Sequence, residues 1–264
     1  MAQPFLFRFD MNRNIKKKKR NIASNIPKKK KSLLIVSFPR SLSSLIFKTC
    51  NKKIPYLKID RSSSKIIENG EIFNYLNDYK KTQFCLKSNK SYERCRKTLD
   101  KYTDGYLIKD VVQPLMVEKY IQENPDNYNV LYIERDIAEV AHRMWDRKWM
   151  WPTTVLGEGK KYTAKKYCKE GEHWKEGLTA LIRALLFIQD NSFNSYTKKV
   201  KYKDIIQNEK HLNNALRNMG YNLKKEHYID DAFLLRASNA NSIRKTKLFK
   251  TIKYIIRKLN DQRE

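Results

Sequence analysis

The sequence predicts an α/β fold, a three-layer sandwich in which helices cover both faces of a central parallel sheet. Short apolar runs typical of buried strands alternate with longer segments whose apolar residues recur at helical spacing. This alternation favours parallel pairing, because each helix returns the chain to the edge of the sheet where the next strand starts. The 264 residues are enough for one such domain and its core.

The elements follow from local patterns along the chain. The predicted strands are short and apolar, and they cover residues 32–37, 54–59, 105–112, 129–133 and 198–202. The predicted helices carry apolar residues at helical spacing, and they cover residues 43–52, 114–124, 137–149, 178–190, 211–219 and 248–259. Residues 71–79 are helical or irregular. Residues 80–104 are polar and lysine-rich, which indicates a surface excursion. Gly220 is a typical signal for the end of the helix before it.

The charge is strongly positive, with 56 Lys and Arg against 28 Asp and Glu and a net charge of +28. Such a field attracts polyanions, anionic membranes and small phosphorylated or sulfated molecules. Residues 1–31 contain two lysine-rich runs, 16–20 and 28–31, which repel themselves and predict a disordered arm. That arm is either simply solvated or a contact to an anionic surface. Residues 32–264 then form the α/β domain.

Cysteine usage and hydropathy narrow the setting. Cys50, Cys85, Cys95 and Cys168 show no metal-ligand spacing, so we expect no zinc site, and a Cys85–Cys95 disulfide stays open. The chain has no run of 18 apolar residues and no signal-peptide core, so we expect no transmembrane segment. These features favour the cytoplasm.

The most informative segment is residues 33–45, LLIVSFPRSLSSL, which predicts a buried strand, a short loop and the start of a helix. The N–H groups at a helix N-terminus attract anions, and the loop adds an arginine and three hydroxyls. A phosphate or sulfate cradle is therefore expected. The residues of this loop are Pro39, Arg40, Ser41, Leu42, Ser43 and Ser44. The loop is not a Walker A motif, because both glycines and the lysine of that motif are missing.

The sequence PRSLSS resembles the loop that binds the 5′-phosphosulfate in sulfotransferases dependent on 3′-phosphoadenosine 5′-phosphosulfate (PAPS), P-[KR]-S-G-[ST]-[ST]. This family has a P-loop-type α/β fold. Leu42 stands where the family has glycine, so the conformation of the loop is in question, since glycine reaches positive φ without strain and leucine does not. The resemblance implies that this loop holds the 5′ side of PAPS and that Arg40 stabilises the leaving phosphate oxygen.

Residues 129–144, NVLYIERDIAEVAHRM, resemble the 3′-phosphate motif of the same family. Arg135 and Asp136 match the motif, Ile137 replaces its proline, and Arg143 replaces its serine. The resemblance implies that Arg135 binds the 3′-phosphate. Arg143 either joins it or points into solvent.

Further segments extend the resemblance over residues 32–247. Residues 202–206, YKDII, resemble the family's Y-E-D-L segment, whose role is mostly structural. Residues 237–247 lie where the family has a basic C-terminal loop that closes over the nucleotide. There Ser242, Arg244 and Lys245 either contact phosphates or remain solvated.

The acceptor proton needs a base within hydrogen-bond reach. Gly70 and Glu71 resemble a Gly-Glu pair whose glutamate is the base in some carbohydrate-type and bacterial sulfotransferases. Glu71 needs burial to raise its pKa, and otherwise it is a surface residue. Asp110 and His142 are rival bases. The implied reaction is in-line transfer of a sulfuryl group from PAPS without a metal.

The acceptor is expected to carry a hydroxyl group, with a carbohydrate favoured. Trp145, Trp149 and Trp151 follow the second motif and have faces that stack on sugar rings, although Trp145 and Trp149 also have the spacing of a core stripe. Three alternatives stay open. They are a P-loop nucleotide or small-molecule kinase, a non-catalytic basic nucleic-acid-binding protein, and an inactive protein with the sulfotransferase fold.

Overall fold

The computed structural model describes residues 31–60, 70–73, 89–147, 174–194, 198–224 and 242–263. All of them lie in one compact unit, Lys31–Glu264. The predicted arm lies outside the described residues, apart from Lys31. No helix in the described ranges has the length and apolarity needed to cross a bilayer.

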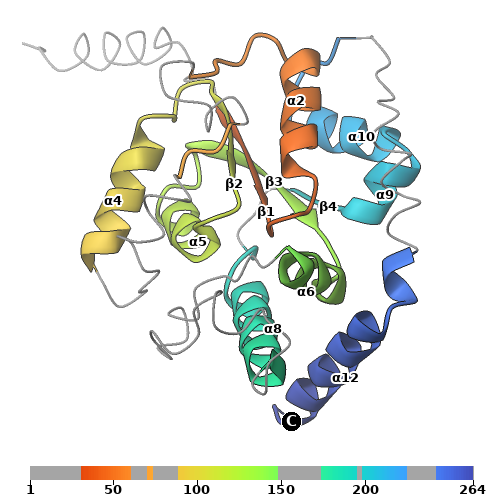
Figure 1. Ribbon diagram of the computed structural model, residues 1–264. Helices are drawn as coiled ribbons and strands as arrows, with labels where there is room; N and C mark the ends of the chain where they lie inside the picture. The colour runs from red at the N-terminus through yellow and green to blue at the C-terminus, as the bar shows by residue number, and fades with distance from the viewer. Residues whose placement is uncertain are drawn as a thin grey trace, which may run out of the picture. The chain divides into compact units, whose positions relative to one another are not determined.

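The structure confirms the α/β fold with a parallel sheet between two layers of helices (Figure 1). Four parallel strands lie in the order β2-β1-β3-β4. The strands are β1 (Ser32–Ser37), β2 (Leu107–Asp110), β3 (Tyr128–Glu134) and β4 (Lys198–Lys201). The central strand β1 is buried along its whole length. A strand buried on both faces reads as a continuous apolar run, and β1 is such a run in the sequence.

Alternate residues of β1 face different cores, as the period of two requires. Leu34 and Val36 pack into one cluster, with helices α4 (Asn89–Asp100), α5 (Pro114–Glu123), α6 (Ile137–Asp146), α8 (Trp174–Asn191) and α12 (Lys247–Asp261). Leu33 and Ile35 pack into the other, with helices α2 (Ser43–Lys53), α9 (Tyr202–Gln207) and α10 (Lys210–Asn218). These two cores hold the strand ends in place.

Two sequence predictions are wrong. Residues 54–59 do not form a strand; Lys58 makes an isolated bridge to Tyr106, and Pro55 lacks the N–H that a ladder needs. Residues 89–100, within the expected surface excursion, form helix α4. It buries Tyr92, Cys95 and Leu99, which recur at helical spacing among charged residues.

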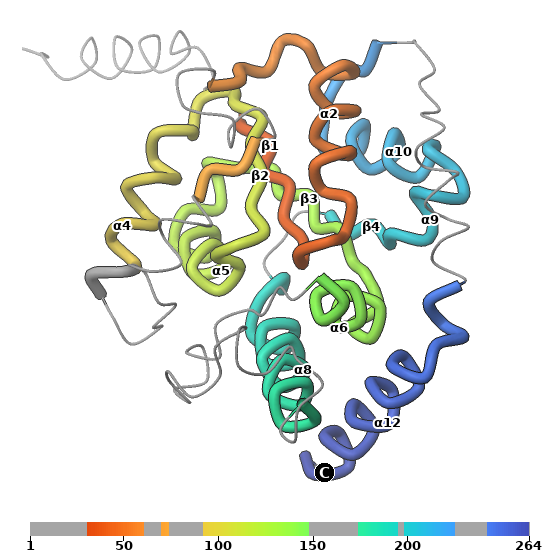
Figure 2. The backbone as a smooth tube through the Cα atoms, in the orientation of Figure 1, coloured from red at the N-terminus to blue at the C-terminus, as the bar shows by residue number. Residues whose placement is uncertain are grey.

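The two sequence motifs, the loop after β1 and the segment that starts at Arg135 after β3, lie next to each other in the fold. Figure 2 shows the turn between β1 and α2 beside the start of α6, which follows β3. Because β1 and β3 are parallel neighbours, their carboxyl ends lie at one edge of the sheet. The edge where β2, β1 and β3 end is therefore the place to look for a ligand site.

Candidate functional site

The loop after β1 has a backbone conformation that favours glycine, although the loop contains no glycine. Arg40 and Leu42 both adopt left-handed conformations, with φ of 66° and 64°. Leu42 is the N-cap residue of α2, and its carbonyl accepts from the N–H groups of Leu45 and Ile46 at 2.9 and 3.0 Å. Such a conformation costs a leucine about 1–2 kcal/mol. The surrounding structure holds this strain, which is typical of functional loops.

The serines of the loop differ in their surroundings. Ser41 is fully buried, and its Oγ has no hydrogen-bond partner among the described residues. Ser43 is buried at the start of α2, and Ser44 accepts from the Lys109 ammonium at 3.0 Å. A buried hydroxyl without a partner is costly, so Ser41 Oγ is suited to a ligand at this helix N-terminus.

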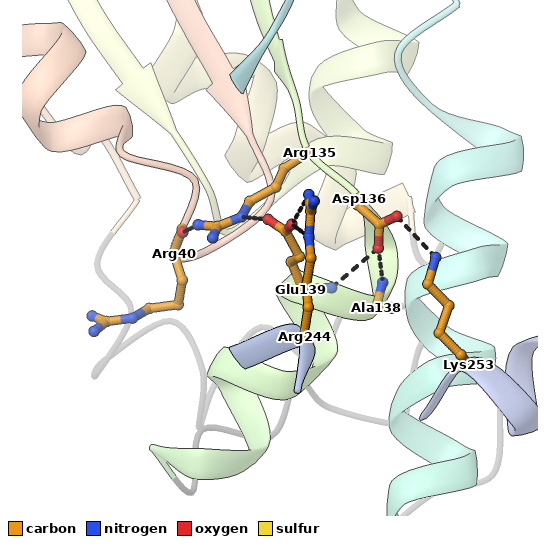
Figure 3. Close-up of polar contacts among 7 residues, drawn as sticks. All are labelled: Arg40, Arg135, Asp136, Ala138, Glu139, Arg244 and Lys253. Atoms are coloured by element: carbon orange, nitrogen blue, oxygen red, sulfur yellow. Dashed lines mark hydrogen bonds and ion pairs between the residues drawn. The ribbon is translucent and has the colours of Figure 1, made fainter. Parts of the chain in front are cut away.

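Arg135 lies at the end of β3 and contacts the loop directly. It is 5% exposed, and its Nη1 donates to the carbonyl oxygen of Arg40 (Figure 3). Its Nε donates to Glu139 Oε2 at 3.2 Å, and its Cζ lies 4.0 Å from the centre of the Tyr202 ring. Its Nη2 is buried with no partner among the described residues. Arg135 therefore presents one unused donor beside the loop, as an anion site requires.

The other basic residues predicted for the site differ in their contacts and in their exposure. Arg244 donates to Glu139 Oε1 through Nε and Nη2, at 3.0 and 2.7 Å, so it joins the same cluster as Arg135. Burial and the nearby Arg135 guanidinium lower the pKa of Arg143. Lys245 is exposed. The side chain of Arg40 is exposed and extends away from Arg135 (Figure 3). Of the predicted residues, the structure thus brings Arg143 and Arg244 to Arg135, whereas the side chain of Arg40 extends away and Lys245 has no contact with this cluster among the described residues.

Glu71 lies beside the end of β2, the other neighbour of β1. It forms a bridge to Lys109, and its carboxylate lies 3.3 Å from the Lys109 ammonium and accepts from the N–H of Val111 at 3.2 Å. The residue is 8% exposed, and burial raises the pKa of Glu71 to about 8. The expectation of a surface glutamate is thereby excluded. The Lys109 ammonium links this carboxylate to Ser44 of the loop.

The rival bases, Asp110 and His142, each have other hydrogen-bond partners. Asp110 is fully buried and accepts from the N–H groups of Val112 and Gln113, so it closes the turn before α5. His142 Nε2 lies 3.1 Å from Thr246 Oγ, which donates to the Ile243 carbonyl. His142 therefore donates to Thr246, and it lies under the N-terminus of α12. Burial lowers the pKa of His142.

A cavity of about 450 Å³ adjoins Arg135. Its walls come from the ends of β3 and β4 and from helices α6, α8, α9 and α12, with Arg244 at one side. Basic side chains, among them Lys201, Lys203 and Lys253, outnumber the acidic ones in its lining. A cavity of this volume, with an excess of positive charge in its lining, fits part of an anionic ligand.

Lys109, Glu139 and Tyr202 contact predicted site residues, although no feature of the sequence had marked them for the site. Tyr202 lies in the YKDII segment, for which we expected a structural role, and the structure places its ring against Arg135. Lys109 and Glu139 had no motif to mark them. A signal was present for Glu139, since it lies four residues after Arg135, a spacing that pairs side chains on a helix.

Trp145 is partly buried against the core, so it has the place of a core residue. Trp149 and Trp151 lie outside the described residues, as do Cys85 and Cys168. Cys95 is a free, buried thiol. Among the described residues, no group of three His, Cys, Asp or Glu side chains could hold a metal ion.

Comparison with known proteins gives a likeness among solved structures alone. No protein-family model matches the chain. No curated protein matches it either. Among solved structures, it is similar to a sulfotransferase domain from the curacin biosynthetic pathway. The identity is 12%, the match covers 88% of this chain and 99% of that one, and the TM-score is 0.43.

Proposed function

We propose that the protein is a sulfotransferase that moves a sulfuryl group from PAPS to an acceptor hydroxyl. The observation that carries the proposal is the pair of buried, unused donors, Ser41 Oγ and Arg135 Nη2, on two adjacent strand ends joined by the bond from Arg135 to Arg40. Two donor sites on adjacent strand ends suit a ligand with two phosphates. Glu71, at the third strand end, supplies a buried carboxylate on the opposite side.

The residues present fit the donor. Ser41, Ser43, Ser44 and the first N–H groups of α2 would hold the 5′-phosphate, with Pro39 and Leu42 shaping the loop. Arg135 would hold the 3′-phosphate. Arg143, Arg244 and Lys245 would add positive charge on that side.

The transfer needs no covalent enzyme intermediate. The acceptor oxygen would form a bond to sulfur while the bond from sulfur to the 5′-phosphate oxygen breaks, and the electron pair would remain on that oxygen. Arg40, whose exposed side chain extends away from Arg135, would turn toward the loop and stabilise the charge that develops there. Glu71 would take the acceptor proton, and Lys109 would hold Glu71 against the loop. Most of the rate enhancement would come from positioning and charge stabilisation.

The acceptor and the setting are also proposals. A carbohydrate hydroxyl remains the first class to test, although Trp145 lends it no support. We retain the cytoplasm as the expected location, and for the basic arm both alternatives, a solvated segment or a contact to an anionic surface. We also retain the division into an arm, residues 1–31, and a domain, residues 32–264.

A kinase is the second candidate, because Lys109 brings an ammonium to Ser44 of the loop. Kinases place a lysine beside the transferred phosphate and need Mg²⁺. Calorimetric titration of the full chain with adenosine 3′,5′-bisphosphate (PAP), and separately with ATP and Mg²⁺, distinguishes the two. We expect PAP to bind and the ATP complex to bind weakly or not at all. Tighter binding of ATP with Mg²⁺ would support the kinase instead.

Activity is tested with labelled PAPS and a panel of glycans, lipids and peptides. Transfer to one class, lost in Glu71→Gln, is the expected result. Arg263→Gln is the matched control, since it removes an exposed arginine that follows the C-terminal end of α12 and pairs with Asp190 of α8. Binding of PAP without transfer to any acceptor would indicate an inactive relative. Steeply salt-dependent binding of DNA or RNA without PAP binding would support the nucleic-acid alternative.

A further inference from the structure

The buried carboxylate of Glu139 accepts hydrogen bonds from two arginines that are far apart in the sequence. Its side chain is 3% exposed, with Arg135 Nε at 3.2 Å from Oε2 and Arg244 Nη2 at 2.7 Å from Oε1 (Figure 3). We infer that Glu139 is a positioning residue that joins Arg135 and Arg244 into a clamp for a phosphate monoester. This inference rests on the proposed function, and it adds the residue that assembles the 3′-phosphate side of the site.

The hydrogen bonds to Glu139 leave one guanidinium nitrogen of Arg135 and one of Arg244 outside these contacts. Glu139 accepts from Arg135 through Nε, and the Arg40 carbonyl accepts from Nη1, so Nη2 is the nitrogen that remains. Arg244 uses Nε and Nη2 on Glu139, which leaves its Nη1 outside that contact. A carboxylate that competed with the ligand would occupy Nη2 of Arg135. Glu139 instead bonds to Nε, the neighbour of Nη2, and leaves Nη2 without a partner among the described residues.

Arg244 needs such an anchor. Its side chain is 54% exposed, and a long exposed side chain loses several rotamers when it is held in one place. It enters the site just before α12, which contacts α6 and α8. Two other contacts tie this segment to the start of α6, the His142–Thr246 hydrogen bond and the Lys253–Asp136 ion pair at 3.0 Å. Glu139 is thus the point where the C-terminal segment is joined to Arg135.

The local charge identifies the class of ligand. Glu139 pairs with Arg135 and Arg244, and the lining of the cavity beside them carries five basic side chains against three acidic ones, an excess of two positive charges. A phosphate monoester carries close to two negative charges near neutral pH, whereas a diester carries one. The clamp therefore favours a terminal phosphate, such as the 3′-phosphate of PAP, over a nucleotide that lacks it.

The test uses the full chain and two probes, PAP and AMP, which differ by the 3′-phosphate. Calorimetry gives the ratio of their affinities for the wild type, Glu139→Gln, Arg244→Gln and the double variant. We expect Glu139→Gln and Arg244→Gln each to weaken PAP binding about tenfold or more and to leave AMP binding nearly unchanged. The double variant should lose little more than either single variant, since both remove the same clamp.

The control is Arg263→Gln, which releases the far end of α12 from α8 and should keep the wild-type ratio. Arg244→Gln keeps the test decisive if Glu139→Gln fails to fold, because Arg244 is largely exposed. Equal losses of PAP and AMP would show a general structural role, and tighter PAP binding by Glu139→Gln would show a competing anion. Either result overturns the inference. If wild-type protein binds AMP as tightly as PAP, the proposed function fails first.

Discussion

Gly70→Ala tests how the structure brings Glu71 to the site. Gly70 has φ of +74°, and a Cβ placed there would lie 2.0 Å from Cε2 of Phe47, with two further ring atoms within 2.5 Å. Phe47 is 2% exposed in the core under α2, so its ring has little room to move. The Gly70 carbonyl also accepts from the Lys109 N–H at 2.7 Å. A methyl group at residue 70 should therefore disturb both the core and the position of Glu71.

The structure supplies a matched control for this change. Gly220 has φ of +84°, and nothing lies within 4 Å of the Cβ that Gly220→Ala would add. Both substitutions place an alanine in a left-handed conformation, at a cost of about 1 kcal/mol each. Both also reduce the entropy of the unfolded chain to the same extent. Gly70→Ala alone overpacks the core, which adds about 1–3 kcal/mol, for a total of about 2–4 kcal/mol.

Urea denaturation followed by circular dichroism measures both changes in the free energy of unfolding. We expect Gly70→Ala to lose about 1–3 kcal/mol more than Gly220→Ala. Turnover should fall for Gly70→Ala in conditions where the variant is still folded, and it should not change for Gly220→Ala. Equal losses for the two variants would refute the close approach of Gly70 to Phe47. They would also refute the position that the structure gives to the neighbouring Glu71.

Three other outcomes follow from the site. Arg40→Ala should lose about 3 kcal/mol or more of transition-state stabilisation, measured as kcat/KM with labelled PAPS, and normal turnover would refute its assignment. Because burial raises the pKa of Glu71 to about 8, the ionised base prevails only above that pH. The wild-type rate should therefore rise with pH to an inflection near 8, whereas any residual rate of Glu71→Gln should not change with pH; a wild-type rate that is flat from pH 6 to about 9 would contradict this. Leu42→Val should destabilise the loop by about 1 kcal/mol, whereas Leu42→Gly should change stability by less than about 1 kcal/mol, both measured by thermal denaturation. A large loss of stability with Leu42→Gly would show that the leucine side chain holds the loop, since it packs against the core formed with α2, α9 and α10.

The sequence predicted the elements that carry a continuous apolar signal. Strand β1 has the predicted bounds, and helix α2 ends one residue beyond its predicted end. Helix α4 was missed because its buried residues are few and lie among lysines and arginines, where charge conceals the helical period. The helix predicted over residues 137–149 ends at Asp146 within the described range.

The site was predictable as far as its motifs reach. Arg135 and the loop could be named from their place after two strands, but their contact depends on β1 and β3 being neighbours, which no local pattern states. The same holds for Lys109, which meets Ser44 because β2 pairs with β1. The conformation of Leu42 could not be derived either, since a leucine on its own favours negative φ.

The most direct measurement is a crystal structure of the protein with adenosine 3′,5′-bisphosphate. We expect one phosphate within hydrogen-bond distance of Ser41 Oγ and the N-terminus of α2, and the other on Nη2 of Arg135. Density for the nucleotide away from this edge of the sheet, or a complex in which Arg135 touches neither phosphate, would contradict the assignment.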